Sequence, residues 1–317
     1  MWSRAGWWVT VLFFMVTWYL TLVACSSSVP LPPSVELIQR VPFQTIQVKD
    51  HRVVYLDIGQ GTPVILIHGF GGSMWQWEYQ YHPLAQSHRV IIPDLIGSGL
   101  SDKPETLYSP AHLVQFFRDF MESLAIEHAT LIGNSMGAGL AMAMALDHPE
   151  AVDRLVLISG FPPQVEASVA SPQYRQFLLH RPPLWLATLG NQMAGRGTTE
   201  RFLKEIIHQP ELVSALVVER SFHNRQRGGL LTPLYSLLDH IDTWEERYGQ
   251  RLGNIAQPTL LLWGDHDRVF PLEVGKRVKT LLPQAEWQVI PGSGHLPQWE
   301  QPQVVNPLIL SFLKKPF

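Results

Sequence analysis

Gly133-Asn134-Ser135-Met136-Gly137 is the stretch of sequence that decides the fold. Its G-x-S-x-G form places a serine on a sharp turn between a strand and a helix, with the hydroxyl at the tip of the turn. The glycines leave room where strand and helix cross, because a Cβ atom there would collide with backbone. The pentapeptide therefore predicts a nucleophile at Ser135.

The residues on both sides of the pentapeptide have the composition that this turn requires. Residues 129–132 form a short apolar run with β-branched members, which is typical of a buried strand in a parallel sheet. Residues 138–146 are rich in helix formers, and the pattern ends at His148-Pro149, where proline stops a helix. A strand, a serine turn and a helix are thus expected in succession.

Strand-like and helix-like runs alternate along most of the chain, which predicts an α/β fold with a mostly parallel sheet flanked by helices. A leading hairpin is expected from residues 43–48 and 52–58. Buried strands are expected at residues 64–67, 90–92, 130–132, 155–158, 259–262 and 287–290. Helices such as 111–124 and 138–148 should lie between them.

One interval breaks the alternation. Between the strand that ends at Ser159 and the strand that begins at Thr259, helix-like runs and breakers such as Pro182-Pro183 follow one another. This interval is too long for a loop. We expect a helical cap at residues 161–253, inserted after the sixth strand and covering the carboxyl ends of the strands, where open α/β sheets bind ligands. Residues 36–160 and 254–317 would form the core.

The N-terminus has the pattern of an export signal. Residues 1–24 carry one positive charge, Arg4, followed by an almost unbroken apolar run. Leu22-Val23-Ala24-Cys25 resembles the lipobox of bacterial lipoproteins, in which the cysteine is lipidated. An exported, membrane-anchored lipoprotein is the favoured interpretation, with residues 25–35 as a Ser/Pro-rich tether. An uncleaved membrane helix is the alternative, because the run is about 18 residues long.

Composition excludes several other classes. The 317 residues include 24 Lys and Arg against 27 Asp and Glu, without a basic block, which argues against a nucleic-acid partner. The single cysteine, Cys25, excludes an intrachain disulfide, and no Cys/His cluster has the spacing of a structural zinc site. No metal is therefore expected.

A serine hydroxyl becomes a strong nucleophile only beside a base, which in turn needs a carboxylate partner. His295 follows the strand-like run 287–290, and Asp267 follows the run 259–262. The order Ser, Asp, His is one that a known triad arrangement uses. Asp265 is an alternative to Asp267 as the acid.

A glycine-rich turn, His68-Gly69-Phe70-Gly71-Gly72, follows the strand-like run 64–67. The backbone amides of Phe70 and Met136 are candidates for an oxyanion hole. Met136 also opens a helix, whose N-terminal dipole favours a developing negative charge. His68 is interpreted as a structural residue of the turn rather than a base.

Taken together, these motifs resemble those of an α/β-hydrolase-fold serine hydrolase. The resemblance is to the capped family that includes carboxylesterases, carbon–carbon bond hydrolases and cofactor-free haloperoxidases. It covers residues 43–317 and implies that Asp267, directly before an Arg-x-x-Pro sequence, is the acid of the triad. The motifs that carry it are His68-Gly69-Phe70-Gly71, Asp94 to Asp102, Gly133 to Gly137, Gly264 to Pro271, and Gly294-His295 with Glu300.

The expected activity is hydrolysis of a small-molecule carboxylic ester or thioester through an acyl-enzyme on Ser135. No cofactor is required, and no glycine turn has dinucleotide-binding spacing. Apolar runs at residues 177–179 and 184–186 in the expected cap favour a lipophilic substrate. Two alternatives stay open: a carbon–carbon bond hydrolase with the same triad, and a membrane-tethered binding protein without catalysis.

Overall fold

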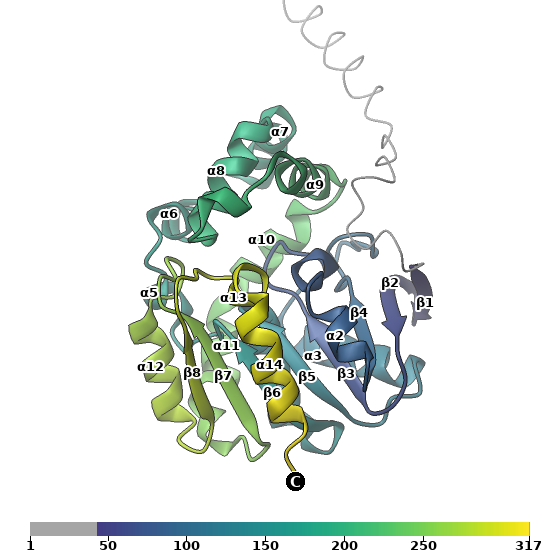
Figure 1. Cartoon of the computed structure of the whole chain (residues 1–317). Coiled ribbons are helices and arrows are strands. Elements are labelled where there is room, and N and C mark those ends of the chain that lie inside the picture. Colours follow the sequence, from purple (N-terminus) through teal and green to yellow (C-terminus); the bar gives the residue numbers. More distant parts are fainter. Residues whose placement is uncertain (1–42, 317) are drawn as a thin grey trace, which may run out of the picture.

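A computed structural model of the chain describes residues 43–316, which are organised around one eight-stranded sheet (Figure 1). The strands lie in the order β1-β2-β4-β3-β5-β6-β7-β8. Their bounds are β1 Gln44–Val48, β2 His51–Ile58, β3 Pro63–Ile67, β4 Arg89–Pro93, β5 Ala129–Asn134, β6 Val152–Ile158, β7 Thr259–Gly264 and β8 Glu286–Ile290. The sheet is parallel from β4 to β8, whereas β1 and β2 form the leading hairpin and β2 pairs antiparallel with β4.

This arrangement confirms the predicted α/β-hydrolase fold, including the hairpin and five of the six expected buried strands. The prediction of a buried strand at residues 287–290 is wrong in one respect, because β8 is the edge strand of the sheet and only Ile290 in it is buried. Strands buried on both faces read as near-continuous apolar runs, which is why they were recognisable in the sequence. The parallel order has a direct consequence for function. The loops that follow β3, β5, β7 and β8 all leave the same edge of the sheet, where they can meet.

Helices cover both faces of the sheet (Figure 1). One apolar layer involves α3 (Pro110–Ser123), α4 (Met136–Asp147) and α12 (Leu272–Leu281). The other involves the 3-10 helix η2 (Met74–Trp77), α2 (Tyr81–Ala85) and α14 (Pro302–Leu313). A short helix, α13 (Pro297–Glu300), precedes α14. The two layers fix the sheet and leave its carboxyl edge free for a site.

The interval between β6 and β7 is helical, as the breaker pattern predicted. It contains α5 (Val165–Ser168), α6 (Pro172–His180), α7 (Leu184–Met193), α8 (Arg196–Ile206), η4 (Pro210–Leu212), α9 (Ala215–Gln226), α10 (Leu231–Asp239), α11 (Ile241–Arg247) and η5 (Gly249–Asn254). Helices α6 to α9 stand beyond the carboxyl edge of the sheet, and α10 descends towards the core (Figure 1). We call α5 to α10 the cap. Helix α11 and η5 instead pack beside α3 and α4, so the cap ends before the expected residue 253.

The expected signal or anchor at residues 1–24, the tether at 25–35 and the lipidation site Cys25 lie outside the described residues. They stay predictions. Within residues 43–316, no helix combines the length and the apolar character needed to cross a bilayer.

Candidate active site

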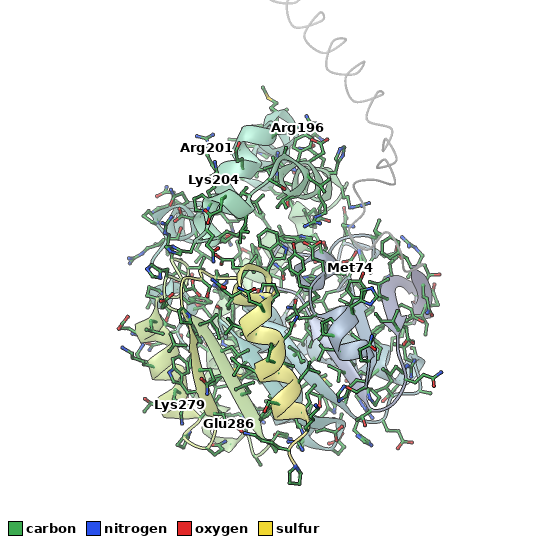
Figure 2. The ribbon with its side chains drawn as sticks, viewed as in Figure 1. Met74, Arg196, Arg201, Lys204, Lys279 and Glu286 are labelled. Carbon is green, nitrogen blue, oxygen red and sulfur yellow. The ribbon has the colours of Figure 1, made fainter. Side chains whose placement is uncertain are left out.

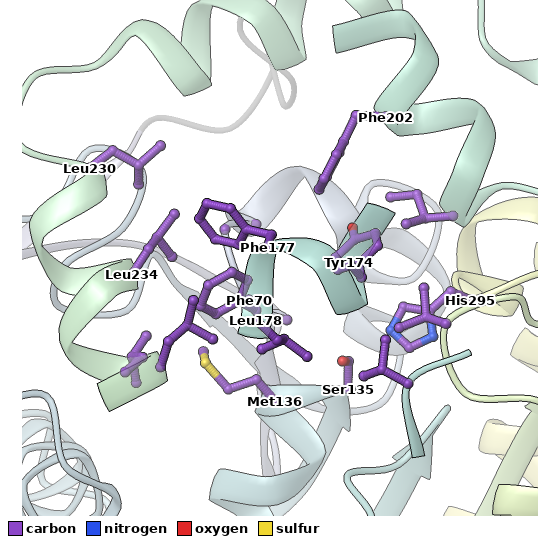
Figure 3. A pocket seen from close by; sticks show the side chains of 18 of the residues that line it. Phe70, Ser135, Met136, Tyr174, Phe177, Leu178, Phe202, Leu230, Leu234 and His295 are labelled. Atoms are coloured by element: carbon purple, nitrogen blue, oxygen red, sulfur yellow. The ribbon is translucent and has the colours of Figure 1, made fainter. Parts of the chain in front are cut away.

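Ser135 lies on a strained turn between β5 and α4. Its backbone has φ 52° and ψ −119°, a conformation that a non-glycine residue seldom adopts. A Cβ atom at Gly133 would lie 2.3 Å from the carbonyl oxygen of Gly137, and one at Gly137 would lie 2.2 Å from that of Ile67. The two glycines are therefore required by close backbone contact, and they hold the Ser135 side chain at the base of a cavity (Figure 3).

His295 and Asp267 form a buried hydrogen-bonded pair. The Nδ1 of His295 lies 2.8 Å from Oδ2 of Asp267, and the Asp267 side chain is fully buried. The other carboxylate oxygen, Oδ1, accepts hydrogen bonds from the backbone N–H groups of Val269 and Phe270, at 2.8 and 2.9 Å. Because Asp267 is fixed on both oxygens, it can fix the His295 ring, which faces the cavity beside Ser135 (Figure 3).

Asp265, the alternative acid, has different partners. Its Oδ1 lies 2.7 Å from Nδ1 of His266 and accepts a weaker bond from the Ser293 backbone N–H, at 3.3 Å. The structure thus brings Asp267, and not Asp265, into contact with His295.

Phe70 and Met136 both line the cavity next to Ser135 (Figure 3). The turn that carries Phe70 is held by Gln76, whose Oε1 accepts a hydrogen bond of 2.8 Å from the Gly69 backbone N–H. His68 is fully buried below this turn, and its Nε2 accepts from the Leu95 backbone N–H at 3.0 Å. Its Nδ1 therefore carries the proton and donates to the Gly69 carbonyl oxygen at 2.8 Å. Burial lowers the pKa of His68, which favours this neutral, structural form.

The cavity above Ser135 has a volume of about 570 Å³ and lies between the sheet edge and the cap. Its walls are predominantly apolar and come from both parts of the fold (Figure 3). Representative side chains are Met136, Phe177, Leu178, Phe202, Leu230 and Leu234. A cavity of this size and character suits a small lipophilic molecule.

Residues 62–302 match the model of the family described as alpha/beta hydrolase fold. The chain belongs to this family. Its fold is thus shared with a large group of proteins.

Three relatives illustrate the range of that group. A 2-hydroxy-6-oxononadienedioate/2-hydroxy-6-oxononatrienedioate hydrolase of Paraburkholderia phymatum is 31% identical over 83% of this chain and 91% of its own length. The solved structure of a meta-cleavage product hydrolase from Pseudomonas fluorescens is 26% identical, with a TM-score of 0.72 over 86% of this chain and 97% of that one. Est816, an N-acyl homoserine lactone degrading enzyme, is 25% identical, with a TM-score of 0.66 over 85% of this chain and 100% of that one.

The cations near the cavity of this α/β hydrolase are already bound by protein groups. Among the described residues, Arg225 is the one Arg or Lys side chain that lines the cavity. Its donors reach five neutral acceptors on Asn191, Ala194, Gly195 and Thr199. Arg220, nearby on α9, forms two bonds of 3.2 Å to the Glu78 carboxylate. Arg225 would have to give up these bonds to hold a substrate carboxylate. Arg220 does not line the cavity, and among the described residues its Nε has no hydrogen-bond partner.

No metal-binding group is apparent in residues 43–316, since no three His, Cys, Asp or Glu side chains there are gathered closely enough to hold an ion.

Glu300 ties the His295 loop of this hydrolase to the cap. Its Oε1 accepts from the Gly294 backbone N–H at 2.8 Å, and its Oε2 accepts from those of His208 and Gln209 at 2.7 and 3.2 Å. The His295 backbone N–H also donates to the carbonyl oxygen of Ile206, at 2.8 Å. Burial raises the pKa of Glu300 from its ordinary 4.5 to about 7, although the N–H groups favour the carboxylate.

This raised pKa predicts a pH dependence of stability. Between about pH 4.5 and 7 the folded protein binds a proton that the unfolded chain has released, so the free energy of unfolding should fall as pH rises through this window. The full effect would be about 3 kcal/mol. Urea unfolding of wild type and Glu300→Gln at several pH values would measure it, because the amide does not titrate. If the free energy of unfolding changed with pH in the same way for both proteins, the prediction would be contradicted.

Some residues of the site were not foreseen from the sequence. Gln76 holds the Phe70 turn, and the Nδ2 of Asn134 donates to the His295 carbonyl oxygen at 3.0 Å. No motif marks Gln76, whereas Asn134 stood inside the pentapeptide without an assigned role. Glu300 was noticed only through the family resemblance.

Proposed function

We propose that the protein is a serine hydrolase that cleaves carboxylic esters or thioesters with lipophilic acyl groups. The observation that carries the proposal is the apolar cavity of about 570 Å³ with Ser135 and His295 in its wall. An acyl chain placed there would gain free energy from every methylene removed from water. The structural relative Est816 is an N-acyl homoserine lactone degrading enzyme, and such a lactone contains a cyclic ester and an acyl chain.

In the proposed mechanism, His295 takes the proton of the Ser135 hydroxyl as its oxygen attacks the substrate carbonyl carbon. The carbonyl oxygen becomes an oxyanion and accepts hydrogen bonds from the backbone N–H groups of Phe70 and Met136. When the tetrahedral intermediate collapses, the bond to the alcohol or thiol breaks, and His295 returns the proton to that leaving group. Water then attacks the acyl-enzyme by the same steps, releasing the acid and restoring Ser135. Asp267 stabilises the imidazolium and holds its tautomer.

Carbon–carbon bond cleavage is the second candidate, because the Paraburkholderia phymatum relative and the Pseudomonas fluorescens structure carry the names of such hydrolases. The substrate in the first name is a dicarboxylate. Burying it would require a cation or several free donors, and Arg220 and Arg225 are both committed to protein acceptors. An uncharged acyl chain needs no such partner, so the apolar cavity favours the ester over that dicarboxylate.

A substrate panel tests the proposal. With p-nitrophenyl esters from acetate to octanoate, kcat/KM should rise by about 100-fold or more, because each buried methylene contributes about 0.8 kcal/mol to binding. The same preparation should not hydrolyse 2-hydroxy-6-oxo-dienoates at an appreciable rate. Their cleavage would be measured as a decrease in their absorbance. Faster turnover of a dienoate than of any ester would assign carbon–carbon cleavage instead. Absence of turnover and of fluorophosphonate labelling would favour the non-catalytic binding protein.

A further inference from the structure

Helix α7 is an apolar helix with no buried side chain. Its sequence, Leu184-Trp185-Leu186-Ala187-Thr188-Leu189-Gly190-Asn191-Gln192-Met193, is mostly apolar, yet every side chain is at least partly accessible. Trp185 is 69% exposed and Met193 is 78% exposed. An ordinary cap helix would bury its apolar side chains against a neighbour.

The two faces of α7 meet different surroundings. Ala187, Gly190 and Asn191 line the cavity. At about 100° per residue, Trp185 lies on the opposite side of the helix from these three residues, and it does not line the cavity. Helix α7 is therefore a wall one helix thick, with the apolar cavity on one side and the molecular surface on the other.

Further apolar side chains are exposed on or next to this wall. Leu186 is 44% exposed on α7, and Leu179 is 48% exposed at the end of α6, just before α7 begins. Large apolar groups that gather on a surface usually mark a contact with another molecule or a membrane. We call Leu179, Trp185, Leu186 and Met193 the outer cap surface.

Basic residues accompany this surface. Residues 172–206 contain Arg175, Arg181, Arg196, Arg201 and Lys204 against Glu200 and Glu205, in a chain whose net charge is −3. Arg196, Arg201 and Lys204 extend from the outer side of the cap (Figure 2). Arg181, Arg196 and Lys204 have acidic partners in Asp239, Glu219 and Glu200. Arg175 and Arg201 have no ion pair within the described part of the chain.

We propose that the outer cap surface docks onto a bilayer that contains anionic phospholipids. Trp185 and Met193 would lie at the level of the headgroups, where tryptophan is favoured, and Arg175 and Arg201 would meet lipid phosphates. Docking would place the thin wall of the cavity against the phase in which a lipophilic ester dissolves. The proposal rests on the exposed side chains of the cap and not on the chemistry at Ser135.

The test must separate this contact from any binding through residues 1–24. In the full chain with Cys25→Ser, a single cysteine is introduced as Met193→Cys and labelled with the fluorophore NBD. The matched control is Leu281→Cys, another exposed apolar residue, on α12 at a distance from the cap (Figure 1). Both are mixed with vesicles of phosphatidylcholine and phosphatidylglycerol in a ratio of three to one.

The expected result is a blue shift of the Met193→Cys label and loss of at least half of its emission to a lipid-borne nitroxide quencher. The label at Leu281→Cys should change little. Arg201→Glu should reduce the response on these vesicles, and Trp185→Ser should reduce it on any vesicle. Hydrolysis of a soluble short-chain ester should be unchanged in both variants, so a failure of docking is distinguishable from a failure of the proposed function.

Two results would overturn the proposal. One is vesicle-bound protein in which the Met193→Cys label stays in water or responds no more than the label at Leu281→Cys. The other is protection of the Met193→Cys label without vesicles, together with a dimer in sedimentation velocity that Trp185→Ser abolishes. That result would assign the outer cap surface to a second copy of the chain.

Discussion

Replacement of Ser135 by alanine is expected to lower kcat for p-nitrophenyl butyrate by about 10⁶-fold. The substitution removes the only atom that forms the acyl bond in the proposed mechanism, while the apolar cavity that binds the substrate is retained. Labelling by a fluorophosphonate probe should disappear with the activity. The strained backbone at φ 52° should relax slightly or stay as it is, so the variant should remain folded.

Ser168→Ala is a suitable control for this experiment, because Ser168 is a buried serine of the cap that does not line the cavity. It should be labelled and should turn over ester at close to the wild-type rate. A labelled Ser135→Ala protein, or one with substantial residual turnover, would place the nucleophile elsewhere and refute the mechanism.

Replacement of Asp267 by asparagine should lower kcat by about 10⁴-fold. The Val269 and Phe270 N–H groups would keep the amide oxygen on their side, so the amide NH₂ would face Nδ1 of His295. Nδ1 would then have to accept a hydrogen bond, which moves the imidazole proton to Nε2. In that tautomer His295 cannot take the proton of Ser135. Steady-state kinetics with a thermal unfolding control would measure the loss.

Asp265→Asn provides the comparison for Asp267→Asn, since the two carboxylates are two residues apart and follow the same strand. Asp265 contacts His266 and Ser293 rather than His295, so its replacement should change kcat only a few-fold. A larger loss for Asp265→Asn than for Asp267→Asn would reverse the assignment of the acid.

Local patterns made much of this fold predictable. Most strands of the core are short apolar runs with a turn signal at their end, and β8, with Glu286 and Gln288, is the exception at the edge of the sheet. A parallel sheet requires no further information to bring the loops after β5, β7 and β8 to one edge. The loops bearing Ser135, Asp267 and His295 could thus be identified before their contacts were known. The interactions that support them could not. Arg220 and Glu78 are 142 residues apart in the chain, and nothing local to either residue indicates the other.

The cap illustrates a second limit of sequence patterns. Two apolar runs, at residues 177–179 and 184–186, were interpreted together as a sign of a lipophilic substrate. Phe177 and Leu178 do line the cavity, whereas Trp185 and Leu186 do not, and both are exposed. An apolar residue in a helix that separates a cavity from solvent can face either side, and only the packing of the neighbouring helices decides which.

The thinness of α7 has a consequence for how this hydrolase could diversify. Because no side chain of α7 is buried, substitutions there should change the free energy of unfolding by only about 0.5 kcal/mol each, except at Asn191, whose side chain binds Arg225. Yet Ala187, Gly190 and Asn191 of this helix shape one side of the cavity. Mutations in α7 can therefore alter which molecules fit beside Ser135 without requiring a second, stabilising mutation in the core. Substrate range and stability can thus change largely independently of each other.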